Sequence, residues 1–210
     1  MKNVLIATMA AAAVSGFASA DIVNGDFSDG SNGWAQYGGS EGPYGVGFFS
    51  GGSAGVVAYG TFGGVPNYSG YTQDLAVAGD FSEGDTISFG GEMFIENGKQ
   101  LFGGNNASVQ ITFWYGSGND FGFAVAAGTL TANSNTNELY SFNSDYVLDA
   151  GAASATRISL DFSYVQNDVP GDGVESGAAW ASNMYGSVVP APGAFALLGL
   201  AGLAGRRRRG

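Results

Sequence analysis

The segment from Ser108 to Tyr115 alternates polar or aromatic residues with apolar ones. Successive side chains of an extended strand point to opposite faces, so Gln110, Thr112 and Trp114 share one face. An aromatic ring beside amide and hydroxyl groups suits a sugar, because a sugar has an apolar C–H face and a polar rim. We therefore predict that Trp114, Gln110, Thr112 and Tyr71 bind a ligand of this kind. The alternative is that Trp114 packs in a core, as we expect for Trp34 and Trp180.

Tyrosines in glycine-rich segments are further candidates for exposed aromatic contacts. The sequence offers four of them: Tyr37, Tyr44, Tyr68 and Tyr71.

Carboxylates offer two other kinds of chemistry. Asp168, Asp172 and Glu175 lie in one Gly/Pro-containing loop, and oxygen ligands on a flexible loop suit Ca²⁺. The alternative there is a solvated acidic turn, with no cofactor at all. Glycoside hydrolysis needs two carboxyl groups at a defined separation. No spacing among the 18 acidic residues singles out such a pair, so the sequence favours a protein that is not an enzyme.

The residues that are missing exclude several functions. The chain of 210 residues has no Cys and no His, which excludes disulfides, thiol nucleophiles and imidazole-based catalysis. Between Asp21 and Val189 there are two basic residues, Lys99 and Arg157, and all 18 acidic ones. A surface this acidic has no footprint for nucleic acid.

The N-terminal 20 residues have the features of a secretory signal peptide. Lys2 precedes an apolar stretch, and Ala18-Ser19-Ala20 satisfies the small-residue rule for cleavage. We expect signal peptidase to cut after Ala20, so that the mature chain begins at Asp21 outside the cytoplasm. The alternative is a buried N-terminal helix.

Residues 189–210 form a second terminal segment with three parts. A Pro-containing hinge at 189–192 precedes an apolar run at 193–205 and the basic cluster Arg206, Arg207, Arg208 and Arg209. An apolar helix of 13 residues rises about 20 Å, which is short for a hydrocarbon core about 30 Å thick. The arginines favour the cytoplasmic side. This pattern predicts transient membrane contact, and an ordinary membrane anchor is the alternative.

This tail resembles the PEP-CTERM sorting signal, which exosortase-type membrane proteases read. The matching residues are Val189, Pro190, Pro192, the Leu/Gly/Ala-rich run and the four arginines, while Ala191 stands where the family has Glu. The resemblance implies an exosortase-like protease as partner, removal of the tail, and delivery to the cell surface or exopolysaccharide matrix of a Gram-negative-type bacterium.

The body, residues 21–188, reads as short strands separated by Gly/Asn/Asp/Ser clusters. Residues 156–165 alternate strictly, with Ile158, Leu160, Phe162 and Tyr164 on the face opposite Arg157, Ser159, Asp161 and Ser163. Residues 85–95 predict a long strand with a bulge at Gly90-Gly91. Weaker strands are expected at 45–50, 54–59, 71–77, 121–126, 140–148 and 180–188. About nine such strands predict an all-β, antiparallel β-sandwich of jelly-roll type, with terminal helices only in the signal peptide and the tail.

The body also resembles galactose-binding-like jelly rolls and related carbohydrate-binding modules. The resemblance rests on Val23-Asn-Gly-Asp-Phe27, Gly33-Trp34, Tyr71-Thr-Gln-Asp-Leu75, Phe81–Phe89 and Ser182-Asn183-Met184. Ser28 and Ser182 replace acids that help to form that family's structural calcium site, so the resemblance does not carry that site over.

Together these patterns predict a secreted, non-catalytic protein of the cell surface or extracellular matrix that associates with exopolysaccharide or another glycan. The alternative is a structural or adhesive matrix protein without specific sugar binding. A glycoside hydrolase is the least favoured reading.

Overall fold

The computed structural model describes residues 21–44, 55–60, 65–117, 120–169 and 177–191. The predicted signal helix, the strand at 45–50, and the tail from Pro192 onward lie outside these residues. All buried core residues in the described ranges lie between Phe27 and Val188, so we expect residues 21–191 to fold as one unit. No helix in this part of the chain is long and apolar enough to cross a membrane.

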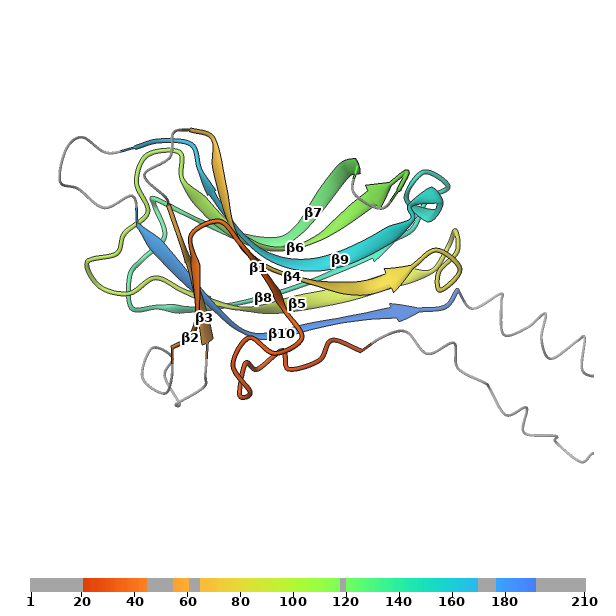
Figure 1. Ribbon diagram of the computed structural model, residues 1–210, viewed down its shortest axis with the longest axis horizontal. Helices are drawn as coiled ribbons and strands as arrows, with labels where there is room; N and C mark the ends of the chain where they lie inside the picture. Colours follow the sequence, from red (N-terminus) through yellow and green to blue (C-terminus); the bar gives the residue numbers. More distant parts are fainter. Residues whose placement is uncertain (1–20, 45–54, 61–64, 118–119, 170–176, 192–210) are drawn as a thin grey trace, which may run out of the picture.

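Ten strands in the described ranges form two antiparallel sheets that stack face to face, as the sequence predicts (Figure 1). Sheet A has the order β1 (Ala35–Tyr37), β4 (Asn67–Val77), β9 (Arg157–Gln166), β6 (Asn106–Tyr115) and β7 (Asp120–Thr131). Sheet B has the order β2 (Ser40–Tyr44), β3 (Gly55–Tyr59), β10 (Ala178–Val189), β5 (Thr86–Phe94) and β8 (Leu139–Val147). The short 3₁₀-helix η1 (Ala152–Ser154) precedes β9.

The core lies between the two sheets and follows the predicted alternation. The inward-facing residues of β9 and β6 are fully buried. On β9 these are Ile158, Leu160, Phe162 and Tyr164, and on β6 they are Val109, Ile111 and Phe113. Trp34 is also buried in this core, and Trp180 is buried in a second, smaller cluster with Val57, Phe94 and Ala178. Because one set of side chains fills the core, the alternate set of β9 and β6 must form the outer face of sheet A.

The strand pairing is irregular at Gly91, as the Gly-Gly pair predicts, but the extra residue belongs to β10 and not to β5. β5 pairs with β8 without a break, whereas its pairing with β10 shifts between Ser182 and Tyr185. A Cβ at Gly91 would lie 2.7 Å from the sulfur of Met184. A Cβ at Gly90 would lie 2.2 Å from the carbonyl oxygen of Phe142 on β8 and 2.6 Å from the hydroxyl of Tyr185 on β10. The two glycines therefore make room for the bulge of β10.

A compact N-terminal loop packs against the edge of sheet A. The side chain of Asn24 donates to the carbonyls of Gly30 (2.8 Å) and Asn32 (3.0 Å) and accepts from the amide of Asp29 (3.0 Å). The ring of Trp34 lies 5.1 Å from that of Phe27, centroid to centroid. The motif that resembles jelly-roll openings thus builds a hydrogen-bonded loop with an aromatic base.

The chain leaves the sandwich at the same end at which it enters (Figure 1). The buried carboxylate of Asp85 accepts from the amide of Ala191 (2.8 Å) through one oxygen and from Ser82 (2.8 Å) through the other. Ala191, in the predicted hinge, is therefore still held against the domain.

Gly70 offers a test of how tightly the strands of sheet A approach one another. Its φ is +150°, and an added Cβ would lie 1.9 Å from the carbonyl oxygen of Phe162 on β9. Gly70→Ala should lower the free energy of unfolding of residues 21–191 by roughly 2–4 kcal/mol, since neither backbone can yield cheaply. The measurement is urea denaturation.

Gly79→Ala is the matched control, because Gly79 also has a positive φ (+103°) but no atom lies within 4 Å of its added Cβ. It should cost about 1 kcal/mol, from backbone strain alone. Equal losses in the two variants would contradict the close approach at Gly70.

Candidate functional site

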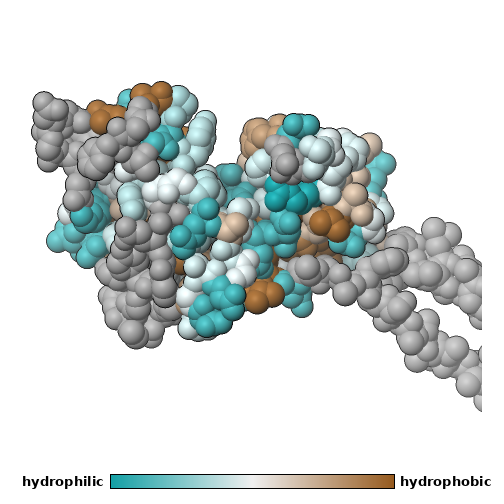
Figure 2. Space-filling model, viewed as in Figure 1, coloured by the Kyte–Doolittle hydropathy of each residue, from teal (hydrophilic) through white to brown (hydrophobic). Residues whose placement is uncertain are grey.

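A groove with a volume of about 720 Å³ lies on the outer face of sheet A. In Figure 1 the strands of this sheet curve so that the outer face is concave, and Figure 2 shows the surface hollowed there between two raised parts. Side chains from all five strands line the groove: Tyr37, Tyr68, Thr72, Gln110, Thr112, Trp114, Phe121, Ala124, Arg157, Asp161, Ser163 and Val165.

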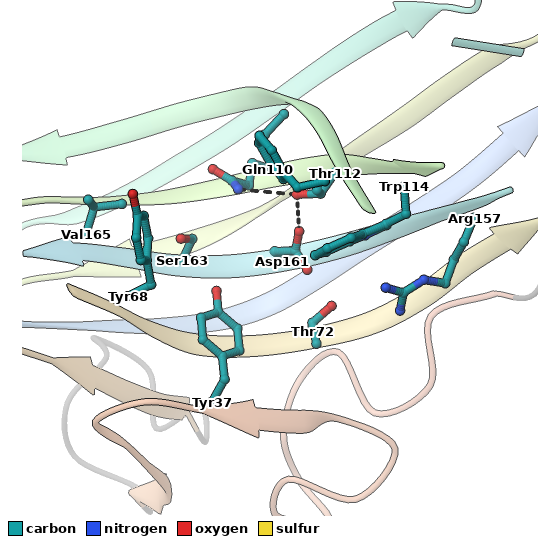
Figure 3. A pocket seen from close by; sticks show the side chains of 12 residues that line it. Tyr37, Tyr68, Thr72, Gln110, Thr112, Trp114, Arg157, Asp161, Ser163 and Val165 are labelled. Atoms are coloured by element: carbon teal, nitrogen blue, oxygen red, sulfur yellow. Dashed lines mark hydrogen bonds between the residues drawn. The ribbon is translucent and has the colours of Figure 1, made fainter. Parts of the chain in front are cut away.

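A chain of hydrogen bonds runs along the groove floor and converges on Asp161. Thr112 and Ser159 donate to this carboxylate, Ser159 at 3.0 Å. Gln110 donates to Thr112 at 3.3 Å, and the indole N–H of Trp114 donates to Ser159 at 2.9 Å. Figure 3 shows Asp161 in the middle of the groove, with the Gln110–Thr112–Asp161 chain on its β6 side. The network fixes the rotamers of the side chains that would meet a ligand.

Asp161 is an unusual residue for such a floor, because only 4% of its surface is exposed. Burial raises the pKa of its carboxyl above the ordinary value. The hydroxyls of Thr112, Thr72 and Ser159 and the positive charge of Arg157 act in the opposite direction but do not reverse the shift. The pKa of Tyr37 is also raised. The main cause is burial of its phenol, and the second is the negative charge of Asp161.

Trp114 stands at one end of the groove in a defined aromatic environment. The guanidinium carbon of Arg157 lies 4.6 Å from the centre of its ring, a cation–π distance. Arg157 is in turn held by Asp74 at 2.8 Å. Phe121, which is 64% exposed, meets the indole edge-on with the ring centroids 6.1 Å apart. Tyr68 and Val165 lie at the opposite end (Figure 3), so the polar floor is enclosed between apolar walls.

A second hollow of about 490 Å³ adjoins the first beyond Arg157. It shares Thr72 and Arg157 with the groove and is otherwise lined by the N-terminal segment, β1 and β4: Asp21, Val23, Gly33, Ala35, Gln73 and Asp74. Gln73 holds the wall in place by accepting from the amide of Val23 (2.6 Å) and donating to its carbonyl (3.0 Å) and to that of Gly33 (2.8 Å).

The structure brings together three of the four predicted ligand-binding residues. Trp114, Gln110 and Thr112 project side by side into the groove from β6. Tyr71 is fully buried in the core and does not line the groove, so the structure does not support a ligand contact for it. Of the other tyrosines, Tyr37 and Tyr68 line the groove. The side chain of Tyr44 lies outside the described residues.

The predicted calcium loop is described only in part. Asp168 accepts from the backbone amide of Gly104 at 2.5 Å, which stabilises the turn before β6. Asp172 and Glu175 lie outside the described residues. Among the residues that the structure does describe, no three His, Cys, Asp or Glu side chains are grouped to hold a metal ion.

Seven residues that line the groove were not predicted as ligand contacts: Thr72, Phe121, Ala124, Arg157, Asp161, Ser163 and Val165. The alternation of residues 156–165 does place Arg157 and Asp161 on the outer face. The sequence gives no sign that this strand lies beside β6, because residues 106–115 and 157–166 are paired over a long separation in the chain.

No protein-family model matches the chain, and no curated protein sequence matches it. Solved structures do share its fold. The C-terminal family 22 carbohydrate-binding module of Clostridium thermocellum Xyn10B is 15% identical with a TM-score of 0.54, over 82% of this chain and 96% of that one. The CBM22-2 xylan-binding domain of Paenibacillus barcinonensis Xyn10C is 9% identical with a TM-score of 0.52, over 79% of this chain and 96% of that one.

A third similar structure contains the CBM22-1 and GH10 modules of C. thermocellum Xyn10B in complex with xylohexaose. It is 10% identical with a TM-score of 0.52, over 82% of this chain and 29% of that one. At these identities the likeness shows the fold. The chain is an all-β sandwich like those of carbohydrate-binding module jelly rolls.

The raised pKa of Asp161 predicts a pH dependence of stability. At pH values between the pKa of an unfolded aspartate and the raised pKa of Asp161, the carboxyl keeps its proton only in the folded state. The contribution of Asp161 to the free energy of unfolding is therefore fully present at low pH and is lost as the pH rises. Asp161→Asn removes the buried charge while an amide can still bond to Thr112 and Ser159. The variant should therefore be more stable than the wild type at neutral pH, and the difference should shrink on acidification.

Urea unfolding of both proteins between about pH 4 and pH 8 measures this difference. A gap that stays constant, or that widens as the pH falls, would show that the Asp161 carboxylate is not destabilised by burial.

Proposed function

We propose that this protein is a secreted, non-catalytic module that binds an uncharged polysaccharide chain in the groove of sheet A. The observation that carries the proposal is the groove itself. Its floor is a fixed network of amide, hydroxyl and carboxylate groups on Gln110, Thr112 and Asp161, and its walls are aromatic. This combination suits the polar rim and the apolar C–H face of a sugar ring.

The similar structures support this reading. One is a xylan-binding domain, and another holds xylohexaose, an oligosaccharide. The hollow beyond Arg157 extends the groove, which favours a chain of several sugars over a single one. Structural likeness at this identity does not select a particular glycan.

Charge favours a neutral ligand. Arg157, one of the two basic residues between Asp21 and Val189, is already paired with Asp74, and Asp161 lies beside it on the floor. The groove therefore offers no unpaired cation among its lining residues to attract a uronic acid or sulfated sugar. The acidic surface around it repels such polymers.

Secretion, removal of the tail by an exosortase-like protease, and residence in the cell envelope or matrix remain predictions from the two terminal segments. The calcium site at Asp168, Asp172 and Glu175 is likewise a prediction from the sequence. Binding assays with calcium and with chelator test it, because loss of binding in chelator would point to a bound cation.

Trp114→Ala is the direct test of the groove. Removing the indole deletes the largest aromatic surface in the groove, so we expect binding to insoluble neutral glycans to weaken at least about tenfold. The assay is a pull-down and a titration of residues 21–191 against a panel of glycans, including the producing cells' exopolysaccharide.

Phe102→Ala is the matched control, because Phe102 is an exposed aromatic residue that does not line the groove. It should bind like the wild type. Equal binding by Trp114→Ala and the wild type, or no binding by the wild type to any glycan, would leave the structural or adhesive alternative.

Ionic strength separates neutral from acidic ligands. Binding to an uncharged polymer should change little between low and high salt, because no ion pair forms with it. A uronic acid polymer of similar backbone should bind more weakly at low salt, and screening should reduce that deficit. Stronger binding to the acidic polymer at low salt would contradict the neutral assignment.

A further inference from the structure

The described chain ends just past β10, in a segment that a buried side chain holds against the sandwich. Proline has no backbone N–H, so Ala191 carries the only amide hydrogen among Pro190, Ala191 and Pro192. This N–H donates to one carboxylate oxygen of Asp85 at 2.8 Å. A hydrogen bond to an ionised carboxylate is stronger than one between neutral groups. We call this contact between Asp85 and Ala191 the C-terminal clasp.

The acceptor of the clasp belongs to a well-supported part of the fold. The second oxygen of Asp85 accepts from the amide of Ser82 at 2.8 Å, and the backbone carbonyl of Asp85 accepts from the amide of Leu148 at 2.8 Å. Leu148 lies in the core, directly after β8. The clasp therefore ties the end of the described chain to the turn before β5 and to the end of β8, at one end of the sandwich (Figure 1).

The clasp restricts which peptide bonds of the hinge a protease can reach. Proteases cut a folded protein at segments that are free or that open locally. Because the amide of Ala191 is bonded to Asp85, the Pro190–Ala191 bond is open to attack only while the clasp is broken. A hydrogen bond to a charged group is strong enough to make the broken state about tenfold or more rarer than the closed one. The Pro192–Gly193 bond lies two residues farther along the chain.

Charge gives a second reason for a cut beyond the clasp. Hydrolysis adds water across a peptide bond, leaving a carboxylate on the domain and an ammonium group on the released tail. A cut directly after Ala191 would place the new carboxylate within about 5 Å of the buried carboxylate of Asp85. Two carboxylates this close repel each other, so this product would lose the clasp. A cut farther along the chain keeps the new charge away from Asp85.

We infer that the C-terminal clasp sets the limit of proteolytic removal of the tail, so that the folded protein is cut on the C-terminal side of Pro192. The mature domain then keeps Pro190 and Ala191, with Ala191 still bonded to Asp85. The inference goes beyond the proposed function, because it assigns a boundary for processing whatever ligand the groove binds. Its tests use no glycan, so its failure is separate from a failure of sugar binding.

A prolyl endoprotease that accepts whole proteins tests the limit, because it cuts after proline and the hinge offers it two bonds. The Pro190–Ala191 bond lies inside the clasp and the Pro192–Gly193 bond lies outside it. In residues 21–210 kept in mild detergent, we expect the cut after Pro192 to be at least about tenfold faster than the cut after Pro190. Mass spectrometry of the products over time measures both rates.

Asp85→Asn should remove most of this difference, because an amide offers one acceptor oxygen in place of two and cannot serve both Ser82 and Ala191. Glu83→Gln is the matched control. It removes one negative charge from an exposed position of the same turn, and it should be cut like the wild type. Far-UV circular dichroism shows whether Asp85→Asn is folded, and if it is not, the wild-type measurements decide.

Hydrogen exchange of the Ala191 amide, followed by NMR in the wild type, gives a readout that needs no variant. The amide should exchange at least about tenfold more slowly than in an unstructured peptide. Exchange at the peptide rate would overturn the inference. Equal cutting after Pro190 and Pro192 in the wild type, or cutting after neither, would also overturn it. So would a folded Asp85→Asn variant that keeps the wild-type preference, or a Glu83→Gln variant that loses it.

Discussion

The groove is built on the buried carboxylate of Asp161. A carboxylate removed from water must be satisfied by hydrogen-bond donors, and here Thr112 and Ser159 supply them from two neighbouring strands. Each donor then holds a further side chain, since Thr112 accepts from Gln110 and Ser159 accepts from Trp114. One unfavourable burial thus fixes the positions of the amide and the indole that line the groove. The arrangement is a common one for functional sites, where local stability is given up to hold groups in place.

The curvature of sheet A and the N-terminal loop supply the rest of the site. The loop that begins at Asp21 lines the second hollow beyond Arg157, and Gln73 on β4 holds it there through three hydrogen bonds. Arg157 links the two hollows because it stacks on Trp114 and pairs with Asp74. The walls are therefore fixed by contacts between residues far apart in the chain, Val23 with Gln73 and Asp74 with Arg157, which gives a site that exists before a ligand arrives.

The sequence predicted the β-sandwich and the residues that β6 contributes to the groove. It could not predict which strands lie next to one another in the sheet. Alternation within residues 108–115 and 156–165 correctly separated core from surface, because that property is local to each strand. Trp114, Gln110 and Thr112 followed from it. Asp161 and Arg157 were placed on the surface but not at the site, because the pairing of β6 with β9 depends on the whole topology. Tyr71 was misplaced because a glycine-rich neighbourhood says nothing about the face on which a side chain lies. The bulge at Gly90-Gly91 was assigned to the wrong strand for a related reason, since the extra residue lies in β10, which is distant in the sequence.

The direction of the hydrogen bonds restricts the ligand further than shape does. An ionised carboxylate only accepts, so the hydroxyl hydrogens of Thr112 and Ser159 both point to Asp161. The indole N–H is likewise engaged, and the Arg157 guanidinium is paired with Asp74. These donors are committed within the protein, whereas the Nε of Arg157 has no hydrogen-bond partner among the described residues. Oxygen lone pairs on Gln110 and Thr112 remain to accept. Under the proposed function, the hydroxyl groups of a neutral sugar chain supply donors to these oxygens, which carboxylate and sulfate groups cannot do.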